Sequence, residues 1–133
     1  MKRFLLYDPR LLLYGFSILI FASYGQTFFI SLFNTEIRIF YNLSDGDFGL
    51  VYAMATLSSS FILISFAKLI DHLDLRIYSF IITLGFLFAC LGMVLLINNV
   101  LYLFLIIFML RFFGQVAMDH AGGTTMARYF GND

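Results

Sequence analysis

Charged residues are scarce in this chain, and their scarcity excludes a soluble fold. Asp, Glu, Lys and Arg make up 12% of the 133 residues, against about 25% in an ordinary soluble domain. Hydrophobic residues reach 62%, and the mean hydropathy is +0.94. Because a folded chain of this length keeps about a third of its surface exposed, it has too few polar residues to cover that surface in water. The composition therefore predicts an integral membrane protein.

Cysteine and histidine are also rare, which removes several kinds of site. The one cysteine, Cys90, can form neither an internal disulfide nor a cysteine-based metal site. The two histidines, His72 and His120, show no ligand spacing, and the chain has no nucleophile elbow, HExxH motif or phosphate-binding glycine loop. The net charge is zero and the charges are dispersed, so no basic face is available for nucleic acid. We expect no enzyme, no cofactor or metal, and no nucleic-acid partner.

Four apolar runs occupy most of the sequence, over residues 11–33, 48–66, 77–97 and 100–120. Each is close to the roughly 20 residues that carry an α-helix across a hydrocarbon core of about 30 Å. The first run exceeds the roughly 7–15 residues of a signal-peptide core and no cleavage site follows it, so we expect it to be retained. The sequence predicts one all-α membrane domain over residues 1–133, with four transmembrane helices in contact with lipid.

The polar segments between the runs predict turns. Residues 34–47 contain several charges and a turn-forming stretch, so we expect the chain to leave the membrane there, with Ser44 or Asp45 capping the next helix. The charged link 67–76 is short, which predicts that the second and third helices are antiparallel neighbours. Residues 121–133 have the small and polar composition of a tail.

Positive charges lie almost entirely on one side of the predicted bundle. Arg38 is the single Lys or Arg in the loops of the opposite side. The positive-inside rule therefore predicts a multi-pass protein of the cell's inner (plasma) membrane, with both ends of the segment in the cytoplasm. The residues that define the cytoplasmic side are Lys2, Arg3, Arg10, Lys68, Arg76 and Arg128.

One charge interrupts the fourth run. Arg111 lies about 16 Å into the membrane at helical rise, where a lone charge costs several kcal/mol or more. Gln115 and Asp119 follow at i+4 and i+8, which predicts a polar stripe facing a cavity or the bundle interior. Two interpretations stay open. Arg111 serves a substrate or a coupled proton, or it pairs with a carboxylate or backbone carbonyls and locks helices together.

Two further polar patches lie within the apolar runs. Gln26 and Thr27 in the first run can meet a small polar solute or hold helices together by hydrogen bonds. Tyr52 and Thr56 form an i+4 pair in the second run, which can add hydroxyls to the same cavity or bond to a neighbouring helix, and we favour the second interpretation.

The link 67–76, Ala-Lys-Leu-Ile-Asp-His-Leu-Asp-Leu-Arg, resembles the cytoplasmic signature of the major facilitator superfamily, Gly-x-x-x-Asp-Arg-x-Gly-Arg-Arg. Asp71 and Arg76 match this signature directly. It belongs between helices two and three, on the side that the positive charges independently mark as cytoplasmic. Residues 111–115 are similar to the family's Arg-x-x-x-Gly stretch in helix four, with Gly114 one position early. The signature positions that differ are Ala67, His72, Asp74 and Leu75.

The resemblance implies a secondary transporter of about twelve helices that works by alternating access. This chain would be its N-terminal fragment, helices 1 to 4, completed by the C-terminal helices of the same transporter. Helices one and four would line the cavity, which makes Gln26, Arg111 and Gln115 candidate substrate contacts. The Arg111 fork suits a small organic anion. Asp71 and Arg76 would form a cytoplasmic gate.

Two other functions remain as alternatives. A complete four-helix chain can dimerise as a small multidrug-type exporter, although Glu36 lies outside the first run and the strong charge bias disfavours the dual orientation of that design. A non-transporting assembly subunit needs only packing residues, with Arg111 as a clamp between helices.

Overall fold

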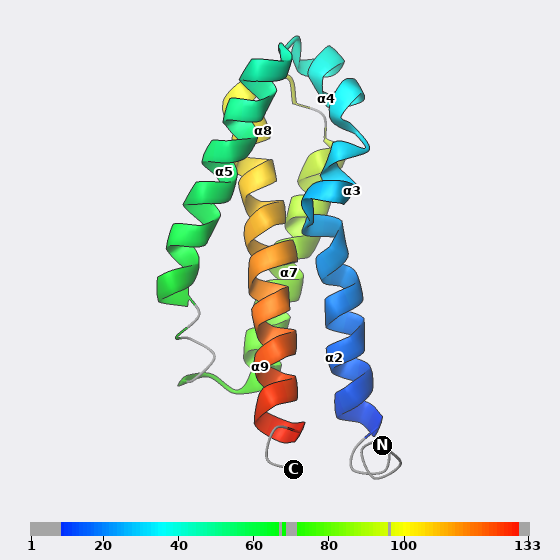
Figure 1. Cartoon of the computed structure of the whole chain (residues 1–133), viewed down its shortest axis with the longest axis vertical. Coiled ribbons are helices and arrows are strands. Elements are labelled where there is room, and N and C mark those ends of the chain that lie inside the picture. The colour runs from blue at the N-terminus through cyan, green and yellow to red at the C-terminus, as the bar shows by residue number, and fades with distance from the viewer. Residues whose placement is uncertain (1–8, 67, 69–71, 96, 131–133) are drawn as a thin grey trace.

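A computed structural model describes residues 9–66, 68, 72–95 and 97–130. Within these ranges the chain is built from helices and turns and contains no strand (Figure 1). Four helical segments are long and apolar enough to cross a membrane. This confirms the predicted all-α membrane fold with four spanning helices. The spans are Pro9–Ser31, Asp45–Phe66, Leu75–Val94 and Val100–Ala127.

The first span is interrupted near its middle. It consists of helix α2 (Pro9–Ala22), the short 3-10 segment η1 (Ser23–Gly25) and helix α3 (Thr27–Ser31). Gln26 separates the last two with an extended backbone, at φ −74° and ψ 154°. The uniform apolar pattern of residues 11–33 predicted a single span but gave no sign of this break.

An additional helix, α4 (Asn34–Tyr41), occupies part of the segment that the sequence predicted as a turn. Its residues Ile37 and Tyr41 lie one helical turn apart and are both buried, so packing on the bundle stabilises this short helix. The helix ends at Asn42, whose φ of 52° is left-handed and whose N–H bonds back to the preceding turn. The reversal of the chain is therefore confined to residues 42–44.

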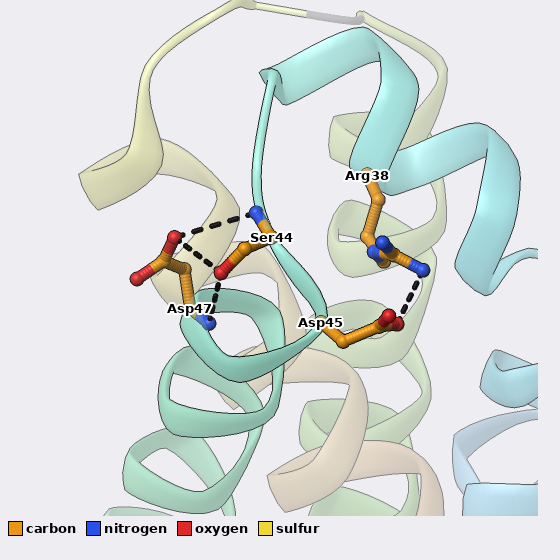
Figure 2. Close-up of polar contacts among 4 residues, drawn as sticks. All are labelled: Arg38, Ser44, Asp45 and Asp47. Carbon is orange, nitrogen blue, oxygen red and sulfur yellow. Dashed lines mark hydrogen bonds and ion pairs between the residues drawn. The ribbon is translucent and has the colours of Figure 1, made fainter.

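Helix α5 (Asp45–Phe66) begins with a reciprocal cap (Figure 2). The Ser44 hydroxyl accepts the Asp47 backbone N–H at 3.1 Å, and the Asp47 carboxylate accepts the Ser44 hydroxyl at 2.6 Å and its N–H at 3.3 Å. Asp45 forms an ion pair with Arg38 instead. Of the two predicted capping residues, the structure selects Ser44.

The third and fourth spans also start at side-chain caps. The Asp74 carboxylate accepts the Arg76 N–H ahead of α7 (Leu75–Val94), and the Asn99 side chain accepts the N–H groups of Leu101 and Tyr102 ahead of α8 (Val100–Met109). The fourth span then passes through a π-helical segment, η2 (Leu110–Ala117), into α9 (Met118–Phe130).

The predicted tail over residues 121–133 is wrong for 121–130, which continue the fourth helix. Small residues here let α9 pack closely on α2. A Cβ on Gly122 would lie 3.0 Å from the Leu19 side chain, and Ala121 is fully buried. Burial against α2 therefore stabilises a segment whose composition alone is that of a polar tail.

The fourth span, made of α8, η2 and α9, is the centre of the bundle. It packs against α5 on one side and against α2 and α7 on the other, with a separate buried apolar cluster on each side. Among the described residues, α5 and α7 meet at Phe66 and Tyr78, whose ring centroids lie 5.6 Å apart, but they share no extended packing. The predicted side-by-side arrangement is therefore found only where these rings meet. The first residues of α2 and the last of α9 lie at the same end of the molecule (Figure 1).

Candidate functional site

The break in the first span lies directly against the π-helical part of the fourth. A Cβ on Gly25 would fall 2.5 Å from the Gln115 backbone nitrogen and 2.6 Å from the Leu110 carbonyl oxygen. A Cβ on Gly114 would lie 3.0 Å from the Gly25 Cα. The two backbones therefore touch, and only glycine fits at Gly25. Irregular backbone at membrane depth is tolerated where protein covers it, and this crossing supplies that cover.

Arg111 lies at this crossing and is 6% exposed. Its Nη1 donates to the Gly25 carbonyl oxygen and to the Thr27 hydroxyl, both at 3.2 Å. Its Nε donates to the Thr56 hydroxyl of α5, also at 3.2 Å. The guanidinium carbon lies 5.2 Å from the centre of the Tyr52 ring. Arg111 therefore joins three spans through neutral acceptors and one aromatic face.

The charge of Arg111 has no counter-charge in the described part of the chain. The one ion pair found there joins Arg38 to Asp45 at the end of the bundle. The Nη2 group of Arg111 makes no hydrogen bond to any described residue. Because Nε and Nη1 already donate to Thr56, Gly25 and Thr27, Nη2 is the donor that remains for a carboxylate or phosphate.

The two glutamines behave differently from each other. The Gln26 side-chain amide donates to the Asp119 carboxylate at 3.1 Å, which links the break in the first span to the start of α9. The Gln115 side-chain oxygen is buried and has no partner among the described residues. A buried amide oxygen without a partner costs about 1–3 kcal/mol, which an incoming donor would recover.

The structure therefore brings Gln26 and Arg111 to one crossing. Arg111 bonds to Gly25 and Thr27, the residues on either side of Gln26. The predicted gate residues lie elsewhere. Arg76 is exposed in the first turn of α7, where its N–H bonds to Asp74, and Asp71 falls outside the described residues.

Sequence reasoning placed Thr27 and Thr56 in polar patches but did not connect either to Arg111. The favoured interpretation of Tyr52 is confirmed, because its hydroxyl donates to Thr27 of the neighbouring span at 2.9 Å. The Gly25 carbonyl was missed as an acceptor, since a continuous helix would have used it internally. Gly25 and Gln26 inside an apolar run are equally compatible with an unbroken helix, so no sequence signal identified the break.

No protein-family model, no curated protein and no solved structure matches the chain.

Proposed function

We propose that this chain forms one wall of a secondary transporter, of the major facilitator type, that binds a small organic anion at Arg111. The observation that carries the proposal is a buried guanidinium with neutral partners and an unused Nη2 donor. Discontinuous helices often build solute sites in transporters, and π-helical segments often occur at functional sites. Both features meet at Arg111.

The energy gained from the contacts of Arg111 is similar in size to the energy that its burial costs. Interhelical hydrogen bonds in membranes average about 0.6 kcal/mol, so the three bonds of Arg111 contribute about 2 kcal/mol. An Arg at the centre of a spanning helix costs about 2.5–3.5 kcal/mol even by insertion measurements. The Tyr52 ring adds about 0.5–2 kcal/mol, so the contacts about balance the cost of burying this charge and leave Arg111 no net stabilising role, whereas an anionic ligand would supply the missing counter-charge.

In this mechanism Arg111 binds the anionic group, and Gln115, four residues further along the same span, has a buried side-chain oxygen without a partner among the described residues. Gln26 acts through its bond to Asp119, which holds the broken first span against the fourth. Asp71 and Arg76 would form cytoplasmic charge pairs that exchange between the two access states, as the resemblance implies. The positive-inside distribution orients both ends of the segment toward the cytoplasm.

A binding experiment tests the proposal directly. Purified protein would be titrated with small monocarboxylates, dicarboxylates and phosphate esters, with thermal stabilisation as the readout. We expect at least one class to stabilise the wild type, Arg111→Lys to weaken that effect, and Arg111→Gln to remove it. Lys68→Gln removes one exposed positive charge and serves as the matched control. Equal anion responses in Arg111→Gln and wild type would contradict the proposal.

A second candidate is the non-transporting subunit, in which Arg111 clamps three spans. Its bond to the Gly25 carbonyl is the observation that favours this function. The clamp predicts that Arg111 stabilises the fold, whereas the transporter predicts that it does not.

A further inference from the structure

A cavity lies between the first span, α4 and α7, and no part of the proposed function uses it. It has a volume of about 720 Å³ and is bounded by α2, α3 and α4 on one side and by α7 and Leu110 on the other. This volume falls within the range of about 300–1,000 Å³ that is typical of small-molecule sites.

The wall of this cavity is mostly aromatic. Consecutive rings from Phe21 to Phe33 contact one another: Tyr24 and Phe29 meet edge to face at 4.9 Å, and Phe29 and Phe33 at 5.5 Å. In each edge-to-face pair, the ring that presents its edge keeps both of its faces free of that partner. The aromatic side chains that line the cavity are Phe21, Tyr24, Phe29, Phe33, Phe40 and Tyr41, with Phe86 on the facing helix.

Glu36 of α4 is the one charged residue in the lining. The nearest basic residue on the same helix, Arg38, is already engaged in the ion pair with Asp45 (Figure 2). Within the described ranges no Lys, Arg or His forms an ion pair with Glu36. The cavity thus combines several aromatic rings with one carboxylate that has no counter-charge.

We infer that this cavity binds a lipophilic cation, such as a quaternary ammonium or phosphonium carrying apolar groups. Ring faces attract cations through their quadrupoles, and the attraction strengthens where water is excluded. The Glu36 carboxylate is exposed, and it adds a Coulomb attraction for a cation that solvent screens in part. An apolar cation satisfies both features, whereas a neutral hydrophobe leaves Glu36 unpaired and an anion is repelled by it.

The single cysteine of the chain lines the same cavity, so Cys90 reports its occupancy. Purified protein in detergent would be treated with N-ethylmaleimide in the presence of tetraphenylphosphonium or of tetraphenylborate, which share shape and size but differ in charge. We expect the cation to slow alkylation of Cys90 at least fivefold and the anion to leave the rate unchanged at equal concentration. Equal protection by both ions would overturn the inference.

Direct binding of tritiated tetraphenylphosphonium provides an independent readout that needs no cysteine reactivity. We expect saturable binding to the wild type and about tenfold weaker binding to Glu36→Gln. Asp47→Asn is the matched control, because Asp47 is an exposed carboxylate at the same end of the bundle but outside the cavity lining. Absence of saturable binding, or equal affinity in Glu36→Gln and wild type, would overturn the inference whatever the outcome at Arg111.

Discussion

The first and fourth spans are irregular, whereas the second and third are regular, and the polar site around Arg111 lies mainly on the irregular pair. Helices α5 and α7 run without interruption over 22 and 20 residues. The first and fourth spans each change helix type midway, and they do so where they touch. Arg111 and its Gly25 and Thr27 acceptors all belong to the irregular pair.

The difference shows how the fold supports polar groups in lipid. A regular helix satisfies its own backbone and can face lipid, and α5 does so, with only 17% of its most apolar window buried. A broken helix frees a carbonyl, which must then find a partner inside the protein. The fourth span provides that partner and is the most buried of the four, at 44%.

The largest effect on stability is expected from a methyl group added where the first and fourth spans touch. Gly25→Ala places a Cβ 2.5 Å from a backbone nitrogen, and backbone atoms cannot move aside as a flexible side chain can. We expect a loss of about 1–3 kcal/mol in the free energy of unfolding, as for other overpacked sites. Reversible unfolding in detergent would measure it.

Gly49→Ala in α5 is the matched control, because nothing lies within 4 Å of its added methyl group. Alanine favours a helix over glycine by up to about 1 kcal/mol, so this variant should be as stable as the wild type or slightly more stable. Equal losses at Gly25 and Gly49 would show that the crossing is not the tight contact described above.

A smaller effect is expected at the start of the regular span α5. Ser44→Ala removes the hydroxyl that accepts the Asp47 N–H and leaves that donor without its cap. The expected loss is about 1 kcal/mol in the same unfolding measurement. Ser60→Ala, whose hydroxyl only bonds to a carbonyl of its own helix, should cost less. A cost at Ser60 equal to that at Ser44 would argue against the cap.

The smallest effect should come from the ion pair between Arg38 and Asp45. The Asp45 side chain is 80% exposed, so solvent screens the pair. We expect Asp45→Asn to cost at most about 1 kcal/mol, and this cost should shrink further as salt is added. A large, salt-independent loss would mean that the pair is shielded from solvent.

The sequence predicted the four spans because long uncharged runs depend only on local composition. It could not predict the break at Gln26 or the π-helical turn at Arg111, since both arise where two distant segments meet. The extra helix α4 was missed although Ile37 and Tyr41 have helical spacing, because the charges around them indicated a turn. The continuation of the fourth helix past residue 120 depends on burial of Ala121 against α2.

The candidate site was predicted in part. Arg111 and Gln26 were identified as polar residues inside apolar runs, which is a local signal. The partners of Arg111 were not predicted, because its acceptors come from residues 55 to 86 positions away in sequence. The bond between Gln26 and Asp119 spans 93 positions and has no sequence signature.

The central claim is that Arg111 is retained for an anion and not for stability, and the free energy of unfolding of Arg111→Met tests it most directly. Methionine keeps much of the side-chain length without the charge. Because the gain from the three hydrogen bonds and the Tyr52 ring only about balances the cost of burying the guanidinium, we predict a variant whose stability lies within about 1 kcal/mol of the wild type. A loss of 2 kcal/mol or more, on the order of the whole hydrogen-bond contribution, would contradict the claim and make Arg111 a structural clamp.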